Sequence, residues 1–320
     1  MTAFRTLVLV LICVVWGLHF SVIKVTVSEI PPIFYVAVRM ALVALLLVPF
    51  LKWHPGQMRR ILIAGTCYGG LNYVFMFTGV KYTSASLGAI LIETYVPLAT
   101  IMSVVFLGEK IRWRRTLGLV LALSGVVVVI TAGQDATGSA NLPLGATLIL
   151  CGALCEATGA ITVKRIEGVS PLQMLAWFGI VGMSITTILT LLLEQDQLAI
   201  LSSDARWAVV AALLYSVIVV SLMGHASYYW LLQRVEVSQV AGGTVMTTLF
   251  AVTFGVLLLG EPLNWQLIVG GLITLAGVAI IVIRSGGKQA QATATVSEAM
   301  GQEVGQPVDV KRADTEELKA

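Results

Sequence analysis

Ten long apolar stretches, separated by short polar connections, make up almost all of the chain as far as residue 284. Each holds about 20 mostly apolar residues, the length that an α-helix needs to cross the hydrocarbon core of a bilayer. The predicted spans are residues 4–27, 32–51, 60–80, 84–107, 114–132, 143–163, 171–193, 206–232, 237–259 and 264–284. The closing segment, 285–320, is polar, and we expect a disordered cytoplasmic tail there. The pattern predicts an all-α integral membrane protein with ten transmembrane helices.

Composition supports a membrane protein and argues against an enzyme. The chain is 58% hydrophobic and only 12% charged, whereas a soluble domain carries about 25% charged residues. We find no metal-ligand cluster, nucleophile triad, phosphate-binding loop or dinucleotide fingerprint in the sequence. We therefore expect no cofactor, no metal and no nucleic-acid partner.

One stretch of the chain occurs twice. Residues 107–130 read LGEKIRWRRTLGLVLALSGVVVVI, and residues 259–283 read LGEPLNWQLIVGGLITLAGVAIIVI. At an offset of 152 residues, Glu109 corresponds to Glu261, and two glycines in the first copy correspond to two in the second. Such internal similarity indicates a duplicated architecture. We predict a first five-helix repeat over 1–133 and a second over 143–284.

The distribution of basic residues predicts how the two repeats lie in the membrane. With a cytoplasmic amino terminus, 16 of the 20 Lys and Arg residues fall on the cytoplasmic side, and only Lys81 and Arg206 fall outside. Cytoplasmic loops of membrane proteins collect Lys and Arg. Four basic residues follow the first Gly-Glu turn, but none follows the second before Arg284. The repeats are therefore predicted to have inverted topology, as in many secondary transporters, with both termini cytoplasmic in a cell (inner) membrane.

Small residues predict where helices touch. Glycines recur seven residues apart in the fifth and tenth spans, at Gly118 and Gly125 and at Gly270 and Gly277. In lipid, helices associate through close backbone approach at such residues. We expect these two helices to form packing or dimer seams rather than to line a substrate cavity.

Glu93 is the most informative ionisable residue. It lies nine residues into the fourth span, about 14 Å deep at 1.5 Å per residue. Pro97 cannot donate to the carbonyl group of Glu93 four residues earlier, so the helix should kink and expose both a carboxyl group and a free carbonyl. Interrupted helices near the midplane are where transporters bind substrate. Glu93 is predicted to bind an amine or a proton; the alternative is a structural partner for a buried cation.

Three other charged residues lie within the spans. Lys24 is one turn from the end of the first span and could snorkel to the lipid headgroups. Arg39 lies about 10 Å inside the second span, where it either ties helices together or pairs with Glu93 or with a substrate carboxylate. Glu156 lies near the middle of the sixth span and corresponds to Trp16 at an offset of 140 residues. Glu156 is expected to be a gate or proton site, or else a satisfied buried acid.

Three helix faces combine aromatic and polar residues. Their members are His225, Tyr228 and Tyr229; Trp16, Phe20 and Lys24; and Tyr68, Asn72, Phe75 and Met76, with His19 beside the second. Aromatic stripes at helical spacing are usually packing surfaces. Together with Glu93, however, they would suit an apolar zwitterion whose side chain lies against the rings.

These residues resemble those of the EamA-type drug/metabolite transporters. The resemblance covers about 1–285 and rests on an ordered set of motifs: Trp16-Gly17 with Phe20 and Lys24, Arg39, Pro97-Leu98, Phe106-Leu107-Gly108-Glu109, and the repeated Leu259-Gly260-Glu261-Pro262. It implies two inverted five-helix repeats, a central cavity, and export of metabolites such as amino acids. Members of the family often have an aromatic residue at the position of Glu156, so this chain departs from the pattern there.

The expected function is inner-membrane export of small metabolites, most directly amino acids, by alternating access through a cavity lined by helices 1–4 and 6–9. A multidrug, organic-cation or purine-type efflux carrier of the same fold is an alternative, and a passive facilitator or channel is an alternative of another class. The expected partners are a small-molecule substrate and the lipid bilayer. The sequence leaves open whether protons are coupled to transport and whether the protein is a monomer or a homodimer.

Overall fold

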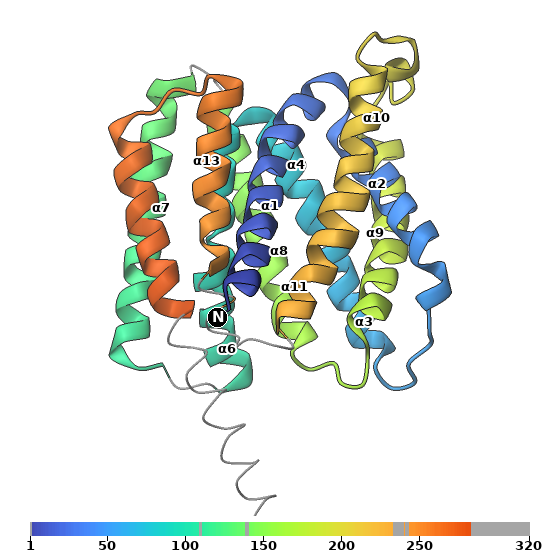
Figure 1. Ribbon diagram of the computed structural model, residues 1–320, viewed down its shortest axis with the longest axis horizontal. Coiled ribbons are helices and arrows are strands. Elements are labelled where there is room, and N and C mark those ends of the chain that lie inside the picture. Colours follow the sequence, from blue (N-terminus) through green and yellow to red (C-terminus); the bar gives the residue numbers. More distant parts are fainter. Residues whose placement is uncertain (1, 109–110, 138–140, 233–239, 241–242, 283–320) are drawn as a thin grey trace, which may run out of the picture.

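The computed structural model describes residues 2–108, 111–137, 141–232, 240 and 243–282, and these form a bundle of helices with no strand within the described ranges (Figure 1). The first half contains α1 (Ala3–Glu29), α2 (Pro32–Leu47), α3 (Met58–Ala64), η2 (Gly65–Leu71), α4 (Asn72–Tyr82), α5 (Ala85–Ile92), α6 (Tyr95–Leu107) and α7 (Trp113–Thr137). The second half contains α8 (Leu142–Val163), α9 (Pro171–Leu193), α10 (Arg206–Leu214), η4 (Tyr215–Gly224), α11 (His225–Leu232), α13 (Met246–Leu259) and a terminal helix, Trp265–Val282.

The predicted all-α membrane architecture is confirmed. Nine helices of the described part are long and apolar enough to cross a membrane, and α13 is a shorter apolar helix. Its predicted beginning, near residue 237, lies outside the described residues, as does the predicted tail 285–320. The third and eighth spans are not uniform α-helices, because each contains a π-helical turn, η2 and η4 respectively.

The repeated Gly-Glu turn has the same backbone conformation in both copies. Gly108 and Gly260 end α6 and α13 with φ angles of 66° and 65°. The Gly108 N–H donates to the Val104 carbonyl, and the Gly260 N–H donates to the Val256 carbonyl, both at 3.1 Å. Positive φ favours glycine at the end of a helix, because a side chain would be strained there. The duplication seen in the sequence is therefore also a duplication of local structure.

The glycine seam joins the two copies directly and shows that they run in opposite directions. A Cβ atom on Gly118 would lie 2.9 Å from the Gly277 carbonyl oxygen, and one on Gly125 would lie 2.5 Å from that of Gly270. In sequence, however, Gly118 corresponds to Gly270 and Gly125 to Gly277. This crossed pairing requires α7 and the terminal helix to be antiparallel, as Figure 1 shows at its left edge. The repeats are inverted, and the seam lies within one chain.

Two carboxylates of the second half cap helices of the first half. Glu261 accepts hydrogen bonds from the backbone N–H groups of Ala85 (2.5 Å) and Ser86 (2.9 Å) at the start of α5. Glu194 accepts them from Ile33 (2.9 Å) and Phe34 (2.8 Å) at the start of α2. A negative charge is favourable where a helix leaves N–H groups without intrahelical partners. Both caps join the two halves, at the end of the bundle away from the amino terminus; Glu109 lies outside the described residues.

The seam predicts that Gly125→Leu will destabilise the protein. The added side chain would separate α7 from the terminal helix, and overpacking of a tight interface costs roughly 1–3 kcal/mol. We expect a lower midpoint of thermal unfolding in detergent, measured by intrinsic fluorescence. Val127→Leu on the same helix is the matched control, since Val127 is 61% exposed and faces away from the seam. Equal midpoints for the two variants would contradict a packed seam.

Candidate functional site

The fourth span is broken at Glu93. The break lies between α5 and α6, where Thr94 forms a turn and Pro97 occupies the first turn of the new helix. The prediction that the Glu93 carbonyl is free is wrong, because this carbonyl accepts a hydrogen bond of 3.0 Å from the Val96 N–H. Because Pro97 has no N–H, the chain tightens so that the preceding residue donates instead. The break therefore places a carboxyl group at mid-span without leaving this carbonyl unpaired.

The side chain of Glu93 connects the two halves. Its Oε1 accepts a hydrogen bond of 2.6 Å from Oγ1 of Thr248 on α13. Tyr95, two residues further along, lies close enough to interact electrostatically with Glu93, with Glu156 and with Tyr228. Glu93 and Glu156 also interact electrostatically with each other. The structure thus brings the two predicted mid-span carboxylates into one region, around Tyr95.

Glu156 belongs to a polar cluster where the sixth span, α8, packs against the third span, which consists of α3, η2 and α4. Its Oε2 accepts a hydrogen bond of 3.0 Å from Asn72 Nδ2, and its Oε1 accepts a longer one of 3.4 Å from the Tyr68 hydroxyl. Asn72 also donates to the Gly152 carbonyl at 3.0 Å. Tyr68 lies in the π-helix η2, and π-helical turns often occur at functional sites. All three residues predicted from the sequence therefore meet here.

The corresponding positions of the other half form an aromatic cluster. Asn72 and His225 are each the first residue after a π-helix, and Glu156 corresponds to Trp16. Where Asn72 binds Glu156, the His225 ring lies 5.4 Å from that of Trp16. Tyr228 lies 5.6 Å from Trp16 on the same side. The same location in the two repeats is thus acidic in one and aromatic in the other.

Arg39 is held in a buried network rather than by Glu93. The residue is 1% exposed, its Nη2 donates to Ser221 Oγ at 3.0 Å, and its guanidinium lies 4.7 Å from the centre of the Tyr73 ring. Phe77 lies 5.8 Å away on the same helix. The Nε and Nη1 atoms have no hydrogen-bond partner among the described residues. Stacking on aromatic faces stabilises a buried guanidinium, yet two of its donor atoms stay unused.

His19 joins the same network through η4. Its Nε2 lies 3.0 Å from Ser216 Oγ, which in turn lies 2.7 Å from the Tyr35 hydroxyl. Ser221 donates to the Ser216 carbonyl at 2.8 Å, so that Arg39 and His19 are linked through one π-helical segment. Sequence reasoning missed Tyr35, Ser216 and Ser221, along with Thr248. Two serines five residues apart within an apolar span were the available signal, since this is the spacing of a π-helical hydrogen bond.

Lys24 has a different environment from the one expected. Its Nζ donates to the carbonyl groups of Val80 (3.0 Å), Lys81 (3.1 Å) and Thr83 at the end of α4. A cation is favourable at that end of a helix, where carbonyl groups lack intrahelical donors. The structure therefore places Lys24 at a helix end and not beside Glu93 or Arg39. The side chain of Tyr229 lies outside the described residues.

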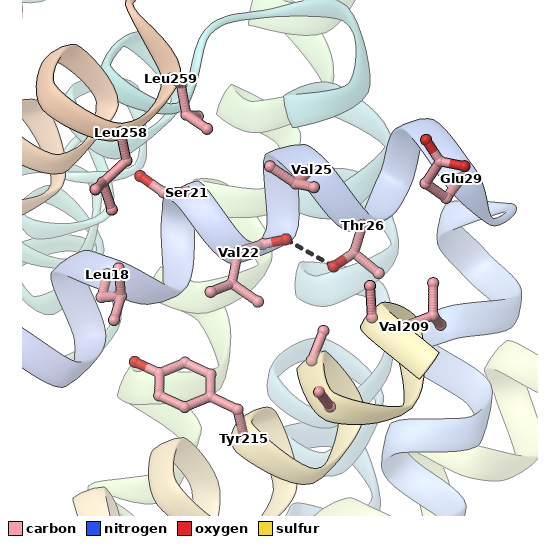
Figure 2. Close-up of a pocket in the computed structure, with 13 residues that line it drawn as sticks. Leu18, Ser21, Val22, Val25, Thr26, Glu29, Val209, Tyr215, Leu258 and Leu259 are labelled. Atoms are coloured by element: carbon pink, nitrogen blue, oxygen red, sulfur yellow. Dashed lines mark hydrogen bonds between the residues drawn. The ribbon is translucent and has the colours of Figure 1, made fainter. Parts of the chain in front are cut away.

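A separate cavity of about 490 Å³ lies between α1, α10, η4 and α13 (Figure 2). Its walls are mainly apolar, and it uses the first, eighth and ninth spans. Among the described residues, no group of three His, Cys, Asp or Glu side chains could hold a metal ion.

This arrangement defines a class of protein: a multi-pass membrane carrier made of two inverted helical repeats with polar residues at mid-span. The model of the EamA-like transporter family matches residues 4–131 and 143–283. The chain belongs to that family, and the resemblance inferred from its motifs is confirmed.

Named relatives are transporters. The chain is 27% identical to a "Probable amino-acid metabolite efflux pump" of Salmonella typhimurium, an alignment that covers 90% of this chain and 96% of the relative. It is 25% identical to a protein of the same description from Escherichia coli, with 85% and 92% covered. A solved crystal structure superposes with a TM-score of 0.59 at 15% identity and covers 88% of this chain and 96% of that one. That last likeness shows the fold alone.

The Arg39 network predicts that Arg39→Lys will lower stability despite keeping the charge. A lysine ammonium cannot both stack on Tyr73 as a plane and donate to Ser221, so the loss should be about 1–2 kcal/mol. The measurement is the thermal unfolding midpoint in detergent. Arg206→Lys is the matched control, because Arg206 is an exposed arginine 5.9 Å from the Trp207 ring. If both variants unfold at the same temperature, the network does not depend on the guanidinium.

Proposed function

We propose that this protein exports small amphiphilic metabolites, most directly amino acids, across a cell inner membrane by alternating access. The observation that carries the proposal is the helix break at Glu93. The half-buried carboxyl group of Glu93 lies at mid-span and accepts a hydrogen bond from Thr248 of the other half. Interrupted helices at the interface of inverted repeats form the substrate sites of many carriers. The names of the bacterial relatives support the same substrate class.

The chemistry of the mid-span region fits a substrate with an amine and an apolar group. Glu93 and Glu156 supply negative charge, and a buried charge needs a counter-ion or a proton. Trp16 and Tyr228 supply an aromatic surface for the apolar part. Arg39 retains donor atoms that can bind a carboxylate once its network opens. In this scheme Glu93 binds either the substrate amine or a proton. It binds the amine when the cavity is open to one side of the membrane and the proton when it is open to the other.

The charge distribution supports the direction of insertion. The proposal places both termini in the cytoplasm, because 16 of the 20 basic residues then face that side. Alternating access would move the two halves relative to each other about the helix interruptions, and the two π-helical turns in η2 and η4 lie in matching places. The substrate cavity would be lined by spans 1–4 and 6–9, with α7 and the terminal helix as support.

Glu93→Gln should reduce transport at least about tenfold, or 1.4 kcal/mol, since it removes the charge while keeping the shape. The assay is counterflow of a mixed metabolite pool in proteoliposomes, read by mass spectrometry, from about pH 5 to pH 8. The matched control is Glu167→Gln, at an exposed position between α8 and α9, which should transport as wild type. Undiminished transport by Glu93→Gln over this range would remove the assignment.

Glu156 allows the amino-acid proposal to be separated from organic-cation efflux. Ligands that bind the folded state raise its apparent stability, so a thermal-shift panel can compare amino acids with lipophilic cations. We expect amino acids to stabilise the wild-type protein and Glu156→Gln to weaken that shift. Stabilisation by lipophilic cations alone would favour a drug-efflux carrier, which the two carboxylates would also suit.

A further inference from the structure

The cavity between α1 and α10 is an apolar groove along the side of the bundle, separate from the mid-span polar cluster. Figure 2 shows Leu18, Val22, Val25 and Thr26 following one another along α1, with Val209 and Tyr215 on the facing helix. Leu258 and Leu259 of α13 close a third side. We call it the α1–α10 groove.

The length of the groove matches one leaflet of a bilayer. Its α1 wall runs from Leu18 to Glu29, which is about 16 Å at 1.5 Å per residue. Half of a hydrocarbon core of about 30 Å is about 15 Å. The groove therefore extends from near mid-span to the membrane surface at the end away from the amino terminus.

The interior of the groove offers little to a polar ligand. The Thr26 hydroxyl donates to the Val22 carbonyl at 2.7 Å, and the Tyr215 hydroxyl donates to the Val15 carbonyl at 2.7 Å. Ser21 is only 3% exposed, and its hydroxyl has no hydrogen-bond partner among the described residues. Because the hydroxyl groups of Thr26 and Tyr215 are already satisfied, the surface presented to an occupant is largely hydrocarbon.

Two charges of opposite sign lie near the outer end of the groove. Glu29 is exposed and lines the groove at its end (Figure 2). Arg206 is exposed at the first turn of α10, three residues before Val209, and so lies on the same face one turn further out. Its neighbour Trp207 is 70% exposed, as is typical of aromatic residues at the membrane interface.

We propose that the α1–α10 groove binds a phosphatidylethanolamine molecule, with one acyl chain in the groove and its headgroup at the rim. The ammonium group binds the Glu29 carboxylate and the phosphate binds Arg206, so the rim is complementary to a zwitterion with a primary amine. An anionic headgroup would meet Glu29 unfavourably, and a trimethylated ammonium group could not donate a hydrogen bond to it.

A lipid at this place bridges the two halves of the carrier. α1 belongs to the first repeat, whereas α10 and α13 belong to the second. The inner end of the bound acyl chain would contact Tyr215, whose ring lies 6.2 Å from that of His19 in the buried network. The acyl chain therefore fills a gap between the halves next to the Arg39–His19 network.

The test uses the full-length protein in nanodiscs of equimolar phosphatidylethanolamine, phosphatidylcholine and phosphatidylglycerol, followed by native mass spectrometry of retained lipid. We expect the wild type to retain phosphatidylethanolamine above its share. Val22→Trp fills the groove and should reduce retention roughly tenfold. Val127→Trp, on a lipid-facing position of α7 that is 61% exposed, should retain it as wild type. Glu29→Gln should lower the preference for phosphatidylethanolamine over phosphatidylcholine, and Glu167→Gln should not.

Wild-type protein supplies a second measurement that needs no substitution. A phosphatidylethanolamine carrying a photoreactive group at the end of its acyl chain should label peptides from α1 and from η4 near Tyr215. Lipids retained in bulk proportion, retention unchanged in Val22→Trp, or labelling spread evenly over the lipid-facing helices would each overturn the proposal. These outcomes do not bear on the transport assay of Glu93→Gln. The proposed lipid site and the proposed substrate site can therefore be refuted independently.

Discussion

Close contact between the glycines of α7 and those of the terminal helix is the constraint on which the rest of the structure depends. Carbonyl oxygens of Gly270 and Gly277 lie where any side chain on Gly125 or Gly118 would stand. Lipid offers no hydrophobic drive for helices to associate, so backbone approach of this kind has to supply it through packing. The crossed pairing also makes the two copies antiparallel, and that inversion places Glu93 opposite Thr248 across the interface of the halves.

Two local departures from regular α-helix give polar groups within the spans new hydrogen-bond partners. The break before Tyr95 lets the Glu93 carbonyl bond to Val96, and η4 lets Ser221 reach the Ser216 carbonyl five residues back. An unsatisfied backbone group in hydrocarbon costs several kcal/mol, so such departures persist only where new bonds replace the lost ones. The same departures place polar groups at mid-span, where the proposed function has the substrate bind.

Duplication followed by divergence explains the unequal character of the two sides. The pair Asn72 and Glu156 and the pair His225 and Trp16 occupy matching places, but one is acidic and the other aromatic. A symmetric site would bind a symmetric ligand or bind one ligand in two orientations. In the proposed function, an acidic side and an aromatic side give an amphiphile one preferred orientation, because its charged and apolar ends contact different repeats.

The sequence by itself determined the membrane architecture, the duplication and the mid-span position of Glu93 and Glu156, because hydrophobic length and repeat spacing are local properties that lipid enforces. Tertiary structure alone decided the partners: Lys24 binds carbonyl groups at the end of α4, Arg39 binds Ser221, and the Glu93 carbonyl is paired. Those outcomes depend on which helix faces bring side chains within 3 Å, and on π-helical turns that shift the register of a span. The Arg39 network spans residues nearly two hundred positions apart, and only the packed bundle brings them together.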